Sequence, residues 1–175
     1  MDEEHWTDDS REMTDEEYRA WMKECNRRII KIGCLTDLLV APAISMIIEE
    51  SFGHRRTLRF AVMRYVPRFG NLQDLRYFDI FAYSETHFFL VECRETARMP
   101  DAEAFVALLP ALREYFPEID RRELVPIFAA IDVGDQLLDY LTEHGVYCMD
   151  IDTDEDIAGT RLTNFDAVQA ARPGR

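Results

Sequence analysis

The sequence predicts an α/β protein in which helices flank a mixed central β-sheet, with the elements in the order α-β-β-β-α-β-α-β. Three observations predict this class. Residues 76–95 alternate and are rich in aromatic and β-branched side chains around a polar centre at residues 84–87, which is typical of two antiparallel strands joined by a tight turn. Amphipathic helical patterns lie on both sides of this hairpin. Strand–helix–strand crossovers after it add strands to the same sheet and place helices on both of its faces.

The first expected element is a helix that begins after Thr14. Residues 14–17 have the form of a capping box. The apolar side chains that follow are spaced three, four and seven apart, like one face of an amphipathic helix: Tyr18, Trp21, Met22, Cys25, Ile29 and Ile32. We expect this face to pack in the core, although a partner helix could cover it instead. A second helical pattern covers residues 35–52, where Pro42 marks a break or a new first turn.

Strands and helices alternate through the rest of the chain. A strand is expected at residues 58–66, then the hairpin, a helix from Pro100 to Phe116 kinked at Pro110, a buried strand at 124–131, a helix at 134–144 and a last strand at 146–151. The last dozen residues have no clear pattern. We therefore expect an acidic, flexible segment at 1–13, a single domain at 14–151 that includes the N-terminal helix, and a tail at 152–175.

Composition excludes several classes of protein. The 175 residues, of which 47% are hydrophobic, suit one globular domain. No apolar run approaches the ~20 residues of a membrane helix, and the N-terminus lacks the pattern of a signal peptide. The four cysteines form no C-x-x-C pair, so we expect buried, reduced thiols in a cytoplasmic protein. The four histidines are scattered without metal-ligand spacing, which disfavours zinc.

The charge of the chain is unevenly distributed. A net charge of −14 disfavours simple binding to nucleic acid, because phosphate affinity depends on Lys and Arg. Residues 1–17 hold nine acids and one base, whereas residues 27–76 hold nine bases and four acids. One side of the domain could therefore be basic, or the charges could be spread over a solvated surface.

The hairpin contains a pair of facing acids. A two-residue turn at Glu85-Thr86 pairs Tyr83 with Phe88 and Phe81 with Leu90, and the same register sets Asp79 opposite Glu92. Strict alternation places Asp79 on the face of Tyr77, Phe81 and Tyr83, and places Phe78, Ile80 and Ala82 on the other. Like charges directly opposed, ~5 Å apart, destabilise a sheet. In such apolar surroundings an unpaired carboxylate costs several kcal/mol or takes up a proton.

Two kinds of cation could hold this pair ionised. Mg²⁺ is usually bound by one or two carboxylates together with waters and substrate phosphate. Arg94 is expected on the same face as Glu92, so that Asp79, Glu92 and Arg94 form one cluster. The structural alternative is that Arg94 neutralises Glu92 while Asp79 lies near a strand end in water.

The order of these motifs resembles the PD-(D/E)XK, or restriction-endonuclease-like, nuclease superfamily, and within it small bacterial stand-alone domains. The resemblance covers residues 33–151. Residues 33–42 (GCLTDLLVAP) look like the family's first helix, residues 77–82 (YFDIFA) like its Asp-bearing strand, and residues 91–94 (VECR) like its Val-Glu-x-Lys segment. The helix that runs from Pro100 to Pro117 ends in the Phe-Pro pattern associated with these domains.

The resemblance implies an activity and a set of site residues. It implies Asp79 and Glu92 as metal ligands, Asp37 as an auxiliary acid and Arg94 in the place of the lysine. Members of the family hydrolyse phosphodiester bonds with one or two Mg²⁺ (or Mn²⁺) ions, which polarise the phosphate and activate water. The chain is thus expected to be a DNA endonuclease or exonuclease. DNA could be bound by four arginines, Arg55, Arg56, Arg59 and Arg64.

Two departures from the family motif leave two functions open. Phe78 stands where the motif has Pro, and Arg94 replaces Lys. Arginine keeps the charge but cannot act as a base. An active nuclease predicts a cluster that opens to a groove lined by the four arginines. A catalytically inactive nuclease fold, serving as a scaffold, self-assembly or protein-interaction module, predicts a closed ion-paired cluster and contacts through the helix around Trp21 or the acidic tails.

Overall fold

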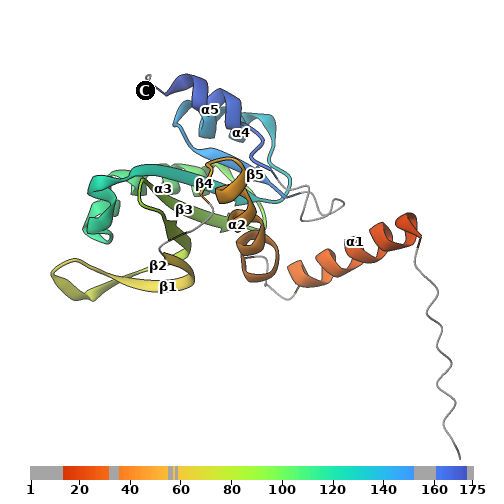
Figure 1. Ribbon diagram of the computed structural model, residues 1–175, viewed down its shortest axis with the longest axis horizontal. Helices are drawn as coiled ribbons and strands as arrows, with labels where there is room; N and C mark the ends of the chain where they lie inside the picture. The colour runs from red at the N-terminus through yellow and green to blue at the C-terminus, as the bar shows by residue number, and fades with distance from the viewer. Residues whose placement is uncertain (1–13, 32–35, 55–56, 58, 152–160, 173–175) are drawn as a thin grey trace, which may run out of the picture.

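A five-stranded mixed sheet forms the centre of the protein (Figure 1). The computed structural model describes residues 14–31, 36–54, 57, 59–151 and 161–172. The strands follow one another across the sheet in chain order: β1 (Arg59–Arg68), β2 (Asn71–Tyr83), β3 (His87–Arg94), β4 (Glu123–Ala130) and β5 (Tyr147–Asp150). Neighbours β1–β2 and β2–β3 are antiparallel, and β3–β4 and β4–β5 are parallel. The predicted α/β class, with helices flanking a mixed sheet, is confirmed.

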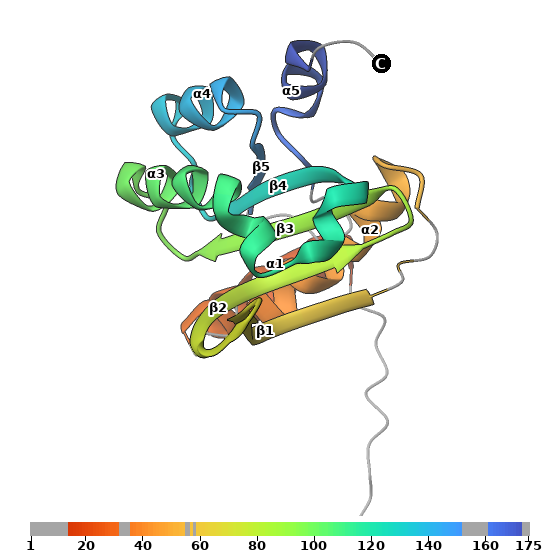
Figure 2. The same cartoon turned by 90° about the vertical axis from the view of Figure 1, so that its left-hand side faces the viewer.

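Helices cover both faces of the sheet (Figure 2). The helical segments are α1 (Asp15–Lys31), the π-helical turn η1 (Thr36–Val40), α2 (Ala41–Glu50), α3 (Met99–Leu108), the 3-10 turns η2 (Leu109–Glu114) and η3 (Pro117–Arg121), α4 (Asp135–Glu143) and α5 (Phe165–Ala171). Side chains of α2 and α5 pack on one face, which we call the α2 face. Side chains of α3, η2, η3 and α4 pack on the other, the α3 face.

Local sequence signals explain several helix boundaries. Glu17 N donates to Thr14 Oγ1 (3.3 Å) and Thr14 N donates to Glu17 Oε2 (3.0 Å), so the expected capping box starts α1. The helix that begins at Met99 changes to a 3-10 turn at Leu109, directly before Pro110, whose ring cannot continue an α-helical ladder. Of the face of α1 expected to pack in the core, Tyr18, Trp21 and Cys25 belong to neither core, and the side chains of Met22, Ile29 and Ile32 lie outside the described residues.

The two cores differ in composition. The α2 face is mainly aliphatic, with Ile44, Ile48 and Ile80 almost fully buried. The α3 face is aromatic and centres on Phe116, whose ring lies 4.9, 4.8 and 5.0 Å from the rings of Phe78, Phe81 and Phe88 respectively. The central strands are held in place because their apolar side chains are buried on both faces of the sheet. Strand β3 contributes apolar side chains to both cores.

The register predicted for the β2–β3 hairpin is confirmed as far as the pair of Ile80 with Val91, and the expected pair of Asp79 with Glu92 lies just beyond the observed ladder. Tyr83 pairs with Phe88 and Phe81 with Leu90. The turn is closed by Ser84, whose main-chain N–H donates to the carbonyl of His87 (2.9 Å). The Ser84 hydroxyl also accepts a hydrogen bond from the main-chain N–H of His87 (3.0 Å). At the tip of the hairpin this side-chain bond takes the place of a main-chain bond between the strands.

The side chains of the β1–β2 hairpin exchange faces at Met63 and Asp79. Val62 and Ile80 pack on the α2 face, whereas Val66 and Phe78 pack on the α3 face. Val62 and Val66 are four positions apart, and Phe78 and Ile80 are two apart, so strict alternation would place each pair on a single face. Met63, which the register sets opposite Asp79, has a left-handed φ of 47°. The prediction that Phe78 shares a face with Ile80 is therefore wrong, because the backbone is irregular at this point.

Two further sequence expectations concern thiols and membranes. Cys25, Cys93 and Cys148 are free, and the last two are buried; Cys34 lies outside the described residues. Across the part of the chain that the structure describes, no helix is long and apolar enough to cross a membrane.

Met63→Gly is expected to leave the free energy of unfolding unchanged or to raise it by up to about 1 kcal/mol, because glycine adopts the left-handed conformation without the cost that Met63 bears. Arg64→Gly, at the adjacent exposed position of the strand, should lower it by about 1 kcal/mol. Urea unfolding of the two variants measures the difference. Equal losses in both would mean that Met63 carries no backbone strain.

Candidate functional site

The middle of β2, the end of β3 and the start of α3 bring four charged side chains together: Asp79, Glu92, Arg94 and Asp101, here called the acidic cluster. Arg94 Nη1 lies 3.7 Å from Asp79 Oδ2, and Arg94 Nη2 contacts Glu92 Oε1. Arg94 Nε lies 3.6 Å from Asp101 Oδ1. Arg94 therefore contacts both Asp79 and Glu92, as the hairpin register predicted. Asp101 also belongs to the cluster, and the register could not predict it because Asp101 lies outside the hairpin.

Asp79 lies where the β2–β3 ladder ends. The last ladder pair is Ile80 with Val91. Beyond it, Asp79 Oδ2 accepts the main-chain N–H of Cys93 at 2.8 Å, so a carboxylate takes the place of a main-chain carbonyl. Glu92 and Arg94 follow two residues apart on β3 and share the α3 face with Leu90, which is why they meet.

Burial disfavours the charged form of both acids. The side chains of Asp79 and Glu92 are only 12% and 19% exposed. Burial raises the pKa of Asp79 above its ordinary value, and the Cys93 N–H and Arg94 offset part of the rise. Burial also raises the pKa of Glu92, which Arg94 lowers and the neighbouring Asp79 raises further. The structural alternative is thus wrong about Asp79, which lies in the protein and not in water.

Four oxygen atoms surround the Arg94 guanidinium group. Besides the carboxylate oxygens of Asp79, Glu92 and Asp101, the main-chain carbonyl of Cys93 accepts a hydrogen bond from Arg94 Nη1 at 2.8 Å. Two carboxylates and a carbonyl are the ligand types that Mg²⁺ and Ca²⁺ prefer. Among the described residues no group of three His, Cys, Asp or Glu side chains could hold a metal ion. An ion here would need the carbonyl, water, substrate or an undescribed side chain to complete its shell.

The π-helical turn η1 lies against the same end of β3. Burial raises the pKa of the Cys93 thiol, and a hydrogen bond from the side chain of Thr36 lowers it in part, which places Thr36 next to Cys93. Asp37 follows Thr36 in η1. The backbone of η1 therefore passes close to the acidic cluster, while the side chain of Asp37 lies outside the described residues.

The arginines expected to bind DNA are only partly described. Arg55 and Arg56 lie outside the described residues. The Arg59 guanidinium lies 5.3 Å above the Phe81 ring, and Arg64 is exposed on β1. Arg76, which sequence reasoning missed, lowers the pKa of Glu92 and so lies near the cluster.

A surface pocket of about 470 Å³ lies elsewhere. It is formed by η2, η3 and the start of β4, with the lining residues Leu109, Pro110, Arg113, Ile119, Asp120, Arg122 and Leu124. Neither the acidic cluster nor the described arginines Arg59 and Arg64 contribute to it.

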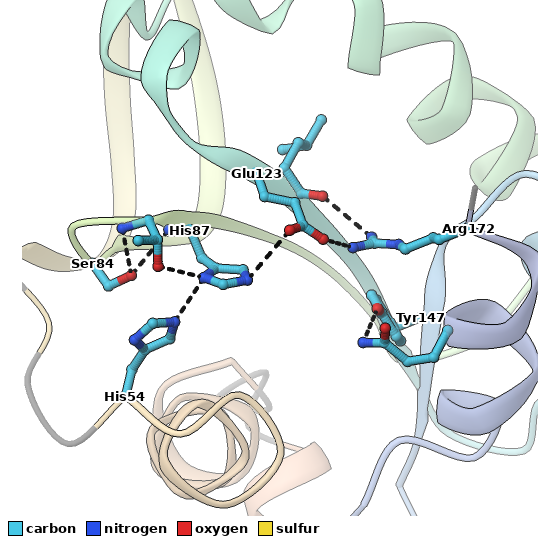
Figure 3. A network of polar contacts seen from close by, with 9 residues as sticks. His54, Ser84, His87, Glu123, Tyr147 and Arg172 are labelled. Atoms are coloured by element: carbon cyan, nitrogen blue, oxygen red, sulfur yellow. Dashed lines mark hydrogen bonds and ion pairs between the residues drawn. The ribbon is translucent and has the colours of Figure 1, made fainter. Parts of the chain in front are cut away.

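A second polar cluster lies at the opposite end of β3 and consists of His54, His87, Glu123 and Arg172 (Figure 3). His54 Nε2 and His87 Nδ1 are 2.7 Å apart, so one of the two rings supplies the hydrogen. His87 Nε2 lies 3.6 Å from Glu123 Oε2, and Arg172 contacts Glu123 Oε1. We call this group the histidine cluster.

The histidine cluster joins four segments that are distant in sequence. It connects the segment that follows α2, the first residues of β3 and β4, and the residue that follows α5. Arg172 also donates to the Leu124 carbonyl (3.3 Å), and its guanidinium lies 5.0 Å above the Tyr147 ring. Nothing in the spacing of the four histidines indicated this contact, since His54 and His87 are 33 residues apart. Its contacts make it a clasp that holds α5 on the sheet.

Asp79→Asn is expected to raise the free energy of unfolding at neutral pH by on the order of 1 kcal/mol, or the melting temperature by about 2–4 °C. Asparagine keeps an oxygen for the Cys93 N–H and removes the charge that burial disfavours. Asp74→Asn is the matched control, because Asp74 forms an exposed ion pair with Arg68, and its effect should be close to zero.

The stability gained by Asp79→Asn is expected to depend on pH. The folded-state pKa of Asp79 lies above its unfolded value, so ionisation costs stability. The cost is absent below the unfolded pKa, appears as pH rises, and is complete above the folded pKa. The advantage of Asp79→Asn should therefore vanish near pH ~4, the ordinary carboxylate range. A variant less stable than wild type at neutral pH would show that Arg94 more than offsets the burial.

Arg172→Ala is expected to loosen α5 and to lower the free energy of unfolding by about 1 kcal/mol, since it removes one ion pair and one cation–π contact. Hydrogen exchange should show faster exchange in α5, with the rest of the sheet unchanged. Arg161→Ala, at an exposed position just before α5, is the control and should have no effect. Equal exchange in both variants would contradict the assignment of a clasp.

Comparison with known proteins gives no match. No protein-family model, no curated protein and no solved structure matches the chain. The resemblance to nucleases stays a prediction.

Proposed function

We propose that the protein is a restriction-endonuclease-like, metal-dependent nuclease whose acidic cluster supports hydrolysis of phosphodiester bonds in DNA. One observation carries the proposal: a cation, the Arg94 guanidinium, is enclosed by Asp79 Oδ2, Glu92 Oε1 and the Cys93 carbonyl. These are hard oxygen ligands around a positive charge. The antiparallel hairpin followed by parallel strands, with Asp79 in the middle of β2 and Glu92 near the end of β3, supports the finer assignment of fold.

The chemistry of the acids supports a role in cation binding. Two buried carboxylates share one guanidinium group, and burial raises the pKa of each. A divalent ion would supply the missing positive charge, polarise a phosphate oxygen and lower the pKa of an attacking water. Asp79 and Glu92 would hold that ion. Because Asp79 is fixed by the Cys93 N–H and Glu92 by its place in β3, the two ligands need little reorganisation.

Arg94 would act as a charge and not as a base. Its guanidinium group keeps its proton, and its planar donors match a phosphate bidentately. When a cation binds the two carboxylates, Arg94 would turn from them to the phosphate and offset negative charge that develops there. Asp37, carried on η1 beside Cys93, would serve as the auxiliary acid.

Exposed arginines of the first two strands support the choice of a nucleic-acid substrate. Arg64 is exposed on β1, and Arg76 on β2 lies near enough to Glu92 to lower its pKa. Phosphate binding by such residues weakens as salt rises. With a net charge of −14, binding has to be local, at this face of the protein.

A second candidate function rests on the same contacts. Arg94 makes ion pairs with Asp79, Glu92 and Asp101 at once, which is the closed cluster expected of a catalytically inactive nuclease fold. In that case the guanidinium is the permanent cation, and the protein would act as a scaffold or interaction module. The two functions differ in whether Mg²⁺ can displace Arg94.

Calorimetric titration with Mg²⁺ and Mn²⁺ and cleavage assays on plasmid, linear and single-stranded DNA test the proposal. Wild type should bind the ion and cut, and Glu92→Gln should weaken both by at least about tenfold through the loss of one ligand. Arg94→Lys should bind the ion more tightly, because lysine fills the space between the carboxylates less completely and pairs with them less well. Asp74→Asn is the control for a carboxylate outside the cluster.

Two results would contradict the nuclease function. One is the absence of ion binding in both wild type and Arg94→Lys. The other is equal cleavage by wild type and Glu92→Gln, which would assign any activity to a contaminant. Ion binding without cleavage of any DNA would favour the inactive, ligand-binding alternative.

A further inference from the structure

The outer half of the β1–β2 hairpin exposes an apolar surface. It consists of Tyr65, Pro67, Leu75 and Tyr77, which pair across the two strands and are here called the hairpin face. Tyr65 is 69% and Leu75 55% exposed, and the rings of Tyr65 and Tyr77 are 5.2 Å apart. Contiguous exposed apolar residues of this kind mark interaction surfaces.

The hairpin face is an extension of the α2 face. Val66 and Phe78 point into the α3-face core, so their neighbours Tyr65 and Tyr77 point to the other side of the sheet. On the inner half of the hairpin that side is covered, since Val62 and Ile80 pack with α2. On the outer half no described helix covers it. The shape and polarity of the surface suit an amphipathic helix that continues the layer.

The chain itself carries such a helix. α1 extends away from the sheet (Figure 1), and two of its aromatic side chains, Tyr18 and Trp21, are 43% and 53% exposed with their rings 6.1 Å apart. Its 17 residues span about 25 Å. The described members of the stripe that predicted core packing, Tyr18, Trp21 and Cys25, belong to neither core. It is an apolar face of a kind that buries itself against another surface.

Charge complementarity matches the two surfaces. α1 begins with the acids Asp15, Glu16 and Glu17, and residues 1–17 hold nine acids and one base. Residues 59–77 of the hairpin hold four arginines and one aspartate. Arg64 and Arg76 stand next to Tyr65 and Tyr77 in the chain and so alternate to the opposite side of the strands, which means that the attraction comes from the overall charge of the hairpin. An acidic, aromatic helix and a basic, apolar strand pair would attract each other.

We propose that α1 of a second copy of this chain packs along the hairpin face, and that the exchange is reciprocal, so that two copies form a symmetric dimer. In the structure α1 points away from the hairpin of its own chain, which favours a contact between copies (Figure 1). Pairing of two β1 edges is disfavoured, because Pro67 lacks an N–H and Met63 interrupts the strand. A reciprocal contact buries both apolar surfaces in one closed assembly.

Analytical ultracentrifugation of the full chain tests this dimer. Wild type should dimerise in the micromolar range, and higher salt should weaken the dimer because its charges are screened. Leu75→Asp and Trp21→Asp should each raise the dissociation constant at least about tenfold, since each places a charge in the apolar contact. Leu72→Asp is the matched control, because Leu72 is an equally apolar and exposed side chain of β2 that lies beyond the register shift after Pro67, outside the paired residues of the hairpin face. It should leave the dimer intact.

Mixing the variants separates a helix-to-hairpin contact from other dimers. Trp21→Asp keeps a sound hairpin face and Leu75→Asp keeps a sound α1, so the mixture should form heterodimers through one intact contact. Native mass spectrometry resolves them from the separate monomers. A hairpin-to-hairpin or helix-to-helix dimer would not be restored by mixing.

Three outcomes would overturn the proposal. The first is a wild type that stays monomeric at high micromolar concentration. The second is a dimer that Trp21→Asp and Leu75→Asp do not weaken. The third is a monomer in which a labelled single-stranded oligonucleotide binds the hairpin face, shown by binding that Leu75→Asp abolishes and Trp21→Asp leaves unchanged. None of these outcomes bears on metal binding at Asp79 and Glu92, so the dimer and the nuclease function stand or fall separately.

Discussion

The hydrogen bond between the Asp79 carboxylate and the Cys93 main chain is the interaction on which the rest of the structure depends. It ends the β2–β3 ladder with a side chain where a carbonyl would otherwise accept the N–H. Opposite Asp79, the left-handed Met63 lets both strands exchange their faces. The exchange divides the hairpin into an inner half inside the core and an outer half that carries Tyr65 and Leu75 into solvent. The buried position of Asp79 and the exposed apolar surface at Tyr65 and Leu75 are thus both associated with the exchange of faces at Met63 and Asp79.

The acidic cluster is poorly explained as a device for stability. Burial disfavours the charges of Asp79 and Glu92, and one guanidinium group, itself 38% exposed, compensates both. Apolar side chains of similar size would often stabilise a protein as well or better. Carboxylates with raised pKa values that converge on a cation are, in contrast, what an ion-binding or catalytic site requires. The cost in stability is therefore an argument for a function, whichever cation occupies the centre.

The sequence predicted what depends on spacing and failed where the backbone departs from regular geometry. Turn chemistry and alternation gave the pairing of Tyr83 with Phe88 and, through it, the contact of Asp79, Glu92 and Arg94. Alternation could not anticipate the exchange of faces, because the φ of Met63 follows from tertiary packing. Contacts between segments distant in sequence could not be predicted, for a different reason. The meeting of His54 with His87 depends on how α2 leads into β1, which no local pattern encodes.

Strand β3 carries a polar cluster at each of its ends, and this placement explains how the site stays ordered. From His87 to Glu92 the strand spans about 16 Å, filled by side chains that are buried on both faces. The histidine cluster fixes His87, the first residue of the strand, to β4 and to the segment that follows α2. Arg94, the last residue of the strand, contacts Asp101 of α3. Glu92 and Arg94 therefore inherit their positions from a central strand held at both ends, and not from loops. No described side chain of α1 belongs to the two cores that hold β3. Binding of another surface to α1 can therefore leave the geometry of Asp79 and Glu92 unaltered.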